Sequence, residues 1–183
     1  TGLGFVFCAQ VCGQDELVFE GASFVLNPDR SLAVQMPHFE EAVTLTEWTR
    51  RGEVLVCAPQ PLAPQPDRLE SIYRAMMLGL RDYVRKNGFP GVILGLSGGI
   101  DSALSAAVAV DALGAGMVRS FMLPSPYTSR DRLEDAAECA RLLGISCDTI
   151  PIEPAMAAFG AALAPIFALW FGLGIWSKVA LAV

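Results

Sequence analysis

A glycine- and serine-rich stretch near the middle of the chain has the residue types that could bind a phosphate group. Its sequence is Gly95-Leu96-Ser97-Gly98-Gly99-Ile100-Asp101-Ser102. The paired glycines permit backbone conformations closed to other residues and leave their amide N–H groups open to a ligand. The serine hydroxyls add further donors, and a helix expected to begin near Ser102 adds the positive end of its dipole. Together these groups form a nest for phosphate oxygens.

Asp101 is the unexpected member of this stretch, because a carboxylate repels phosphate. A bound Mg²⁺ resolves the conflict, since Mg²⁺ favours a carboxylate together with phosphate oxygens. The stretch lacks the Gly-Lys-Ser/Thr ending of a Walker A loop and the Gly-x-Gly-x-x-Gly dinucleotide fingerprint. On composition alone the alternative stays open that this is a plain glycine turn, with Asp101 serving near the start of a helix.

The elements around this stretch must place it where a ligand can bind. Asp67 is a good N-cap, with Glu70 three residues later, and Asn87-Gly88 ends the helix that they begin. The expected order is helix 67–86, strand 91–96, helix 102–113, strand 118–123, helix 131–143 and strand 145–152. This alternation predicts an α/β fold with a parallel sheet, and ligands bind such sheets beyond the carboxyl ends of the strands.

The first 56 residues favour β-structure instead. The expected strands are 3–7, 17–19 after a polar turn at 13–16, 23–26, 32–34, and one around Val43, Leu45 and Glu47-Trp48. Asn27-Pro28-Asp29 favours a turn, so 23–34 is a hairpin candidate. Five such strands cannot close a core of their own, and we interpret them as the end of a larger domain. Four prolines between Cys57 and Pro66 then predict a stiff, extended linker.

Composition limits the class of protein and its partners. The 183 residues are 53% hydrophobic and 17% charged, with a formal net charge of −6, which suits one domain or pieces of two. The acidic balance argues against nucleic acid as a partner, because that partner needs a basic face. Five cysteines match no common zinc or disulfide spacing, so we expect reduced, mostly buried thiols in a cytoplasmic protein. The chain begins at Thr1 without a basic leader, and we expect it to be a piece of a longer protein.

Ser97-Gly98-Gly99-Ile100-Asp101-Ser102 resembles the Ser-Gly-Gly-x-Asp-Ser signature of the ATP pyrophosphatase (PP-loop) family. The sequence on both sides narrows the resemblance. Segments 83–89, 109–114 and 124–129 are similar to glutamine-dependent NAD⁺ synthetases, and segment 13–24 is similar to the end of their nitrilase-like glutaminase domain. The resemblance runs from Gly2 to Phe167 and joins two different domains in the expected order.

This resemblance implies a fold, a reaction and its partners. Residues 1–56 are then a β-strand remnant of a nitrilase-like α/β/β/α domain, 57–66 a linker, and 67–168 the first half of a Rossmann-like adenine nucleotide alpha hydrolase domain. The family amidates deamido-NAD⁺ to NAD⁺, using ATP, Mg²⁺ and ammonia from glutamine. Gly95 to Ser102 would bind ATP and pyrophosphate, Asp101 would bind the metal, and the intact protein would form a homo-oligomer.

The catalytic residues of the glutaminase are not assigned to this chain. In the family the nucleophilic cysteine and its Glu and Lys partners would lie before Thr1, and neither Cys8 nor Cys12 sits in that motif. We therefore expect this chain by itself to be inactive. Two other readings stay open: another PP-loop ATP pyrophosphatase or amidotransferase, and a truncated chain without enzymatic activity.

Residues 169–183 form an apolar tail that departs from the family pattern. No charged residue occurs from Pro154 to Ser177, a length sufficient for a membrane span. Pro165 and three glycines interrupt the run. This favours a buried helix followed by an aberrant end, rather than a membrane span.

Overall fold

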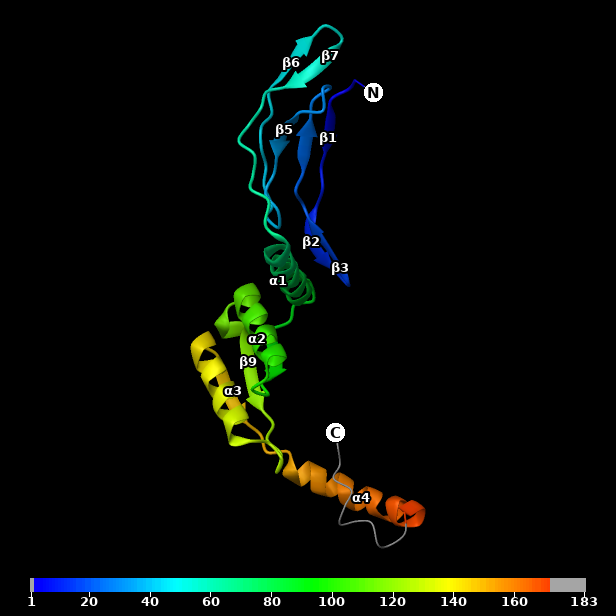
Figure 1. Ribbon diagram of the computed structural model, residues 1–183, viewed down its shortest axis with the longest axis vertical. Helices are drawn as coiled ribbons and strands as arrows, with labels where there is room; N and C mark the ends of the chain where they lie inside the picture. The colour runs from blue at the N-terminus through cyan, green and yellow to red at the C-terminus, as the bar shows by residue number, and fades with distance from the viewer. Residues whose placement is uncertain (1, 172–183) are drawn as a thin grey trace. The chain divides into compact units, whose positions relative to one another are not determined.

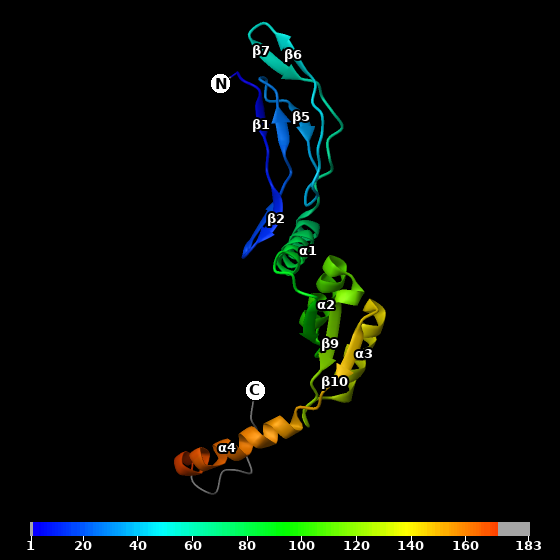
Figure 2. The ribbon, with the colours of Figure 1, turned by 180° about the vertical axis from the view of Figure 1, so that it is seen from behind.

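The computed structural model describes residues 2–171, which form two compact units. The first contains residues 2–92 and 104–119, and the second contains residues 93–103 and 120–171. Figure 1 labels their elements, and Figure 2 shows them from behind. The Pro-rich segment 57–66 lies inside the first unit, and its residues 58–66 form neither helix nor strand, as expected. A hydrogen bond joins this segment to a neighbouring strand: Gln60 N–H donates to the Ala33 carbonyl at 2.9 Å.

Short antiparallel strands make up the β part of the first unit. They are β1 (Phe5–Phe7), β2 (Val11–Gln14), β3 (Leu17–Glu20), β4 (Phe24–Leu26), β5 (Leu32–Gln35), β6 (Trp48–Arg51) and β7 (Val54–Cys57). One sheet has the order β1-β4-β5, and β2-β3 and β6-β7 are hairpins. Its core consists of buried side chains from β4, β5 and β7: Val25, Ala33, Val34 and Cys57.

The predicted hairpin at 23–34 is confirmed, and its turn also fixes β7. Arg30 N–H donates to the Asn27 carbonyl at 2.8 Å, which closes the turn. The buried Asn27 side chain then accepts from Cys57 N–H at 2.8 Å and donates to the Cys57 carbonyl at 3.2 Å. A buried amide that satisfies both backbone groups of one residue stabilises a single register.

One predicted strand and the extent of one predicted turn are wrong. Residues 41–47 form no strand, and the side chains of Val43 and Leu45 are 98% and 89% exposed. The strand begins only at Trp48 and pairs with β7 across a two-residue turn, Gly52-Glu53. The supposed turn at 13–16 is also shorter, because Gly13 and Gln14 belong to β2.

The cysteines are free, as expected, but the prediction that most are buried is wrong. Only Cys57 is buried, Cys8 is exposed, and the other three are partly exposed. Burial raises the pKa of the Cys57 thiol, which keeps it protonated. The small size of cysteine allows burial, but packing decides whether a given one is covered.

Helix α1 (Arg68–Lys86) has the predicted ends. The Asp67 side chain accepts from Glu70 N–H at 2.9 Å, Asn87 is the C-cap, and Gly88 follows with φ of 66°. Tyr73 on this helix donates to Asp111 of α2 at 2.6 Å, and this bond raises the pKa of the tyrosine. The charged partner therefore favours the neutral phenol, which can donate.

The β2-β3 hairpin packs on α1 at a point where both backbones come close. Gly13 N–H donates to Asp82 at 2.9 Å, and Lys86 donates to the Gly13 carbonyl at 2.6 Å. A Cβ added to Gly13 would lie 2.8 Å from the Cα of Gly79. Glycine is therefore required at this contact because no side chain fits.

The remaining elements alternate between strand and helix. They are β8 (Val92–Gly95), α2 (Ile100–Leu113), the 3₁₀ turn η1 (Ala115–Met117), β9 (Val118–Met122), α3 (Arg130–Leu143) and β10 (Ser146–Thr149). The strands pair in the order β10-β9-β8. Ile150 N–H donates to the Met122 carbonyl and Ile152 N–H to that of Pro124, so both chains advance in the same direction. The predicted α/β fold with a parallel sheet is confirmed.

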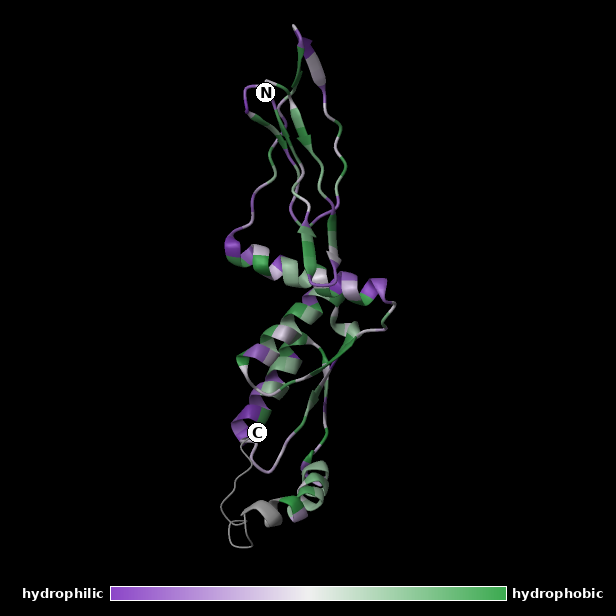
Figure 3. Ribbon diagram, turned by 90° about the vertical axis from the view of Figure 1, so that its right-hand side faces the viewer, coloured by the Kyte–Doolittle hydropathy of each residue, from purple (hydrophilic) through white to green (hydrophobic). Residues whose placement is uncertain are grey.

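Helix α4 (Glu153–Phe171) follows the sheet and is apolar along most of its length, as its green colour in Figure 3 shows. It is not buried as predicted: Phe159 is 71% and Ile166 is 56% exposed. An apolar helix is buried only where another layer covers it, and the described residues do not cover this one. Within residues 2–171, no helix combines the length and hydrophobicity needed to cross a membrane. The tail prediction beyond Phe171 lies outside the described residues.

The close approach at Gly13 can be tested by one methyl group. We expect Gly13→Ala to lower the free energy of unfolding by about 1–3 kcal/mol, because the added Cβ forces the hairpin away from α1. Gly116→Ala is the matched control, since a Cβ there meets nothing within 4 Å. The measurement is urea denaturation followed by circular dichroism, and equal stability of both variants would contradict the packing described.

Candidate functional site

The glycine- and serine-rich stretch forms a turn from strand to helix, as predicted. β8 ends at Gly95 and α2 begins at Ile100. The helix begins two residues earlier than the predicted Ser102, because the Gly99 carbonyl already accepts from Ala103 N–H at 3.2 Å. Ile100, Asp101 and Ser102 are therefore its first turn. This places the positive end of the α2 dipole directly at the glycine pair.

Two serine hydroxyls organise the turn. Ser102 Oγ accepts from Ser97 N–H at 3.2 Å, lies 3.1 Å from Ser97 Oγ and donates to the Gly99 carbonyl at 3.0 Å. Gly99 N–H points at Ser97 Oγ at 3.4 Å. Two backbone amides thus converge on one pair of hydroxyl groups. An anionic oxygen could take the place of these hydroxyls as the acceptor, which is how such turns bind phosphate.

Gly98 holds the turn against α3. Its φ is 73°, and a Cβ added to it would lie 2.8 Å from the Cα of Arg132 and closer still to the carbonyl oxygen of that residue. Two features require glycine at position 98: the left-handed backbone conformation and the close contact with the backbone of Arg132. The contact fixes the turn beside the first part of α3.

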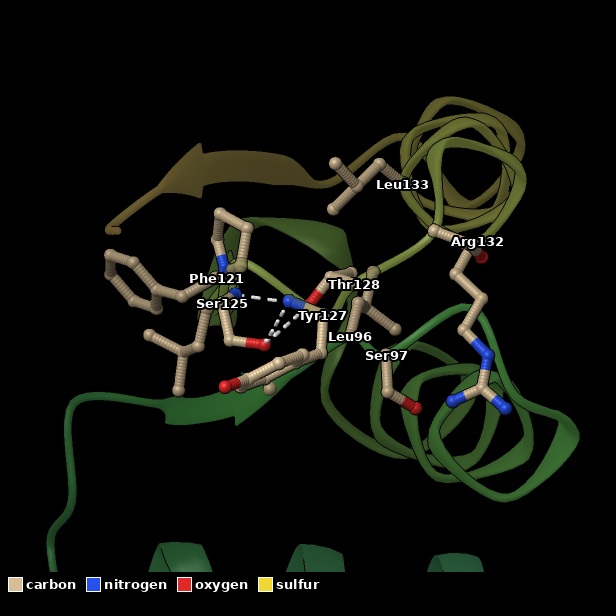
Figure 4. A pocket seen from close by; sticks show the side chains of 12 residues that line it. Leu96, Ser97, Phe121, Ser125, Tyr127, Thr128, Arg132 and Leu133 are labelled. Carbon is tan, nitrogen blue, oxygen red and sulfur yellow. Dashed lines mark hydrogen bonds between the residues drawn. The ribbon is translucent and has the colours of Figure 1, made fainter. Parts of the chain in front are cut away.

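A cleft of about 610 Å³ opens at the carboxyl ends of β8 and β9, next to the start of α3 (Figure 4). The two strand ends are joined by Leu96 N–H, which donates to the Phe121 carbonyl at 2.9 Å. The cleft is lined by Gly95, Leu96, Ser97, Phe121, Leu123, Pro124, Ser125, Tyr127, Thr128, Ser129, Arg132 and Leu133. Its volume lies in the range of small-molecule sites.

Residues after β9 line this cleft although the sequence reasoning did not include them in the site. Ser125 N–H donates to Thr128 Oγ1 at 3.0 Å, and Tyr127 N–H donates to Ser125 Oγ at 3.2 Å. These bonds, dashed in Figure 4, hold the loop in a tight turn. The signal that could have found it is topological, because neighbouring parallel strands end at one edge of a sheet.

A smaller cavity of about 230 Å³ lies against another part of the turn. It is lined by Leu96, Gly98, Gly99, Ile100, Ser102, Ala103, Asp135, Ala136 and Cys139. The predicted site residues are therefore divided. Gly95 and Ser97 line the large cleft, Gly98 to Ile100 with Ser102 line the small one, and Leu96 lines both. Asp101 lines neither of these two cavities and is exposed in the first turn of α2. Within the described part of the chain, no three His, Cys, Asp or Glu side chains are grouped to hold a metal without further ligands.

Fold and candidate site together define an α/β protein whose glycine turn lies at the carboxyl edge of a parallel sheet. The model of the NAD synthase family matches residues 72–167, more than half of the chain. The chain belongs to the NAD synthase family.

Relatives of known name match over a longer part of this chain. The glutamine-dependent NAD⁺ synthetase of Rhodobacter capsulatus is 54% identical over 168 residues, which cover 92% of this chain. That of Acinetobacter baylyi is 43% identical over 163 residues, or 88% of this chain. The match covers 30% of the length of each relative.

Solved structures agree with this assignment. Glutamine-dependent NAD⁺ synthetase from Acinetobacter baumannii, in complex with ADP, superposes with a TM-score of 0.85 at 44% identity, covering 91% of this chain and 31% of that one. The enzyme from Cytophaga hutchinsonii shares the fold with a TM-score of 0.68 at 15% identity, covering 90% of this chain and 33% of that one.

The requirement for glycine at position 98 is open to a direct test. We expect Gly98→Ala to lower the free energy of unfolding by about 1–3 kcal/mol from the left-handed backbone alone. Gly99→Ala should cost less, because its Cβ meets only Ser97 Oγ at 3.4 Å. Denaturation midpoints of the two variants provide the comparison, and a Gly99 variant as unstable as the Gly98 variant would refute this account of the turn.

Proposed function

We propose that this chain is part of a glutamine-dependent NAD⁺ synthetase and supplies its ATP-binding turn. The observation that carries the proposal is the 54% identity over 92% of the chain, since it extends through both the β part and the α/β part. In this proposal residues 1–56 are the end of the nitrilase-like glutaminase domain and 57–66 the linker. Residues 67–168 are the first half of the Rossmann-like synthetase domain, a range similar to the 72–167 family match.

The proposed ATP site is the turn from Gly95 to Ser102. Converging amides, the two serine hydroxyls and the start of α2 suit a polyphosphate. The relative from Acinetobacter baumannii was solved with ADP, which supports a nucleotide as the ligand. Homo-oligomer formation, a cytoplasmic location and the lack of a nucleic-acid partner stay predictions.

The proposed reaction activates a poor electrophile. A carboxylate oxygen of deamido-NAD⁺ attacks the α-phosphorus of ATP, and the bond to pyrophosphate breaks. Ammonia from glutamine then attacks the adenylated carboxyl carbon, loses a proton and expels AMP, which leaves the amide of NAD⁺. The part of this chain is to hold the phosphates, since donors aimed at the leaving pyrophosphate stabilise the charge that develops on it.

Asp101 fits a magnesium ion that is shared with the nucleotide. Mg²⁺ is commonly bound by one or two carboxylates together with substrate phosphates, and Asp101 is an exposed carboxylate in the first turn of α2. When bound there, Mg²⁺ would neutralise part of the negative charge on pyrophosphate. Asp101 would thus contribute to affinity only when the metal is present.

The role of Asp101 gives a metal-dependent prediction. We expect Asp101→Asn to weaken ATP binding about tenfold with Mg²⁺, the scale of one hydrogen bond to a charged group. With EDTA the variant should bind at least as well as the parent, because without the metal the carboxylate only repels the phosphates. Asp148→Asn in β10, exposed and outside both cavities, is the control. Calorimetric titration measures both, and an Asp101 variant that binds ATP–Mg²⁺ as the parent does removes this residue from the metal role.

Binding and turnover should separate in this chain. We expect the 183-residue chain to make no NAD⁺ from deamido-NAD⁺, ATP and Mg²⁺, with either glutamine or ammonium. It matches only 30% of the length of its relative, and misplacement of reacting groups by about 1 Å can cost roughly 100-fold in rate. Chromatography of the products is the assay, with the full-length Rhodobacter capsulatus relative as positive control. Steady turnover by the chain alone would overturn this expectation.

A further inference from the structure

The two cavities beside the turn differ in charge. Among the described residues that line the large cleft, Arg132 is the only charged one. Among those that line the small cavity, Asp135 is the only charged one. A polyphosphate is attracted to the first and repelled by the second. We propose that the phosphate tail of the nucleotide lies in the large cleft and that Arg132 binds it, an inference that rests on the ATP site proposed above.

The position of Arg132 is set by the turn itself. Its backbone lies against Gly98, where no Cβ would fit. Figure 4 shows its side chain extending from α3 toward the side of the turn where the Ser97 hydroxyl points. The anchor of the side chain is therefore fixed relative to the turn, whose residue Ser97 lines the same cleft.

The guanidinium of Arg132 forms no ion pair with any of the described residues. Two other arginines of α3 form ion pairs with their own helix, Arg130 with Glu134 at 2.7 Å and Arg141 with Glu138 at 2.6 Å. Within residues 2–171, Arg132 has no such partner. An arginine that has no carboxylate to release can offer its full set of donors to a phosphate, in the bidentate geometry that lysine cannot reproduce.

The N-terminus of α3 adds to the field of Arg132 in the large cleft. Ser129, the N-cap residue of α3, lines this cleft, and its side chain makes no capping hydrogen bond. The cleft is thus bordered by the start of α3 as well as by Arg132, whereas the first residues of α2 line the small cavity. A helix start favours an anion by its dipole. Selectivity for a nucleoside polyphosphate over an uncharged nucleoside follows from this arrangement.

The experiment separates the two halves of the ligand. Binding of ATP, inorganic pyrophosphate and adenosine to the 183-residue chain is measured by calorimetry with Mg²⁺ present. We expect Arg132→Gln to weaken ATP and pyrophosphate about 10- to 100-fold, the range for a hydrogen bond to a charged group, and to leave adenosine unchanged. Arg132→Lys should recover part of the loss, because it keeps the charge but not the planar fork.

Arg130→Gln is the matched control, since Arg130 is two residues away, pairs with Glu134 and does not line the cleft. It should bind all three ligands as the parent does. Thermal unfolding of each variant excludes a folding defect at this exposed position.

Each contrary outcome has its own meaning. If the parent chain binds ATP and Arg132→Gln binds it equally well, the role of Arg132 is wrong and the ATP site stands. An equal loss of ATP and adenosine would make Arg132 a structural residue and also overturn the inference. Tighter ATP binding by Asp135→Asn, with no loss in Arg132→Gln, would place the phosphates in the small cavity. If the parent binds neither ATP nor pyrophosphate, the proposed function fails, and this inference fails with it.

Discussion

The contact between Gly98 and the backbone of Arg132 is the constraint on which the candidate site depends. It leaves no room for a Cβ and requires a left-handed conformation, so it determines the residue type in the middle of the turn. The same contact brings the first turn of α3 beside the residues that lead into α2. The glycine turn and the backbone of Arg132 are thereby positioned by one close approach.

Local signals in the sequence predicted much of the fold, because their causes are local. The Asp67 cap and the end of α1 at Asn87 are formed as expected, since each depends on hydrogen bonds within a few residues. The strand around Val43 was wrong for the opposite reason. Its apolar residues are spaced as a strand would have them, but a strand also needs a pairing partner, which the pattern cannot supply. The hairpin from Trp48 to Cys57 had a two-residue glycine turn as its signal.

The sequence predicted where the turn of the candidate site lies in the chain, but not which of its residues line a cavity. The residues from Gly95 to Ser102 form the expected turn, yet they line two different cavities, and Asp101 lines neither of the two. Which side of a turn a residue faces depends on what packs beside it, here α3, and no periodicity within the turn encodes that. Arg132 was not predicted as a site residue for the same reason. It lies 30 residues beyond Ser102 in the sequence, and the folding of the parallel sheet brings it beside the turn.

Net charge and local charge act at different distances in this protein. With a formal charge of −6 the chain repels a polyphosphate at long range, but beyond about 8 Å such repulsion is largely screened at physiological salt. Within the cleft the balance reverses, because Arg132 is its only charge among the described lining residues and the start of α3 borders it. Short-range donors with fixed directions can therefore select an anion that the protein as a whole does not attract. Affinity in such a site depends on geometry more than on total charge. That geometry depends on Gly98, because any side chain there would collide with the backbone of Arg132.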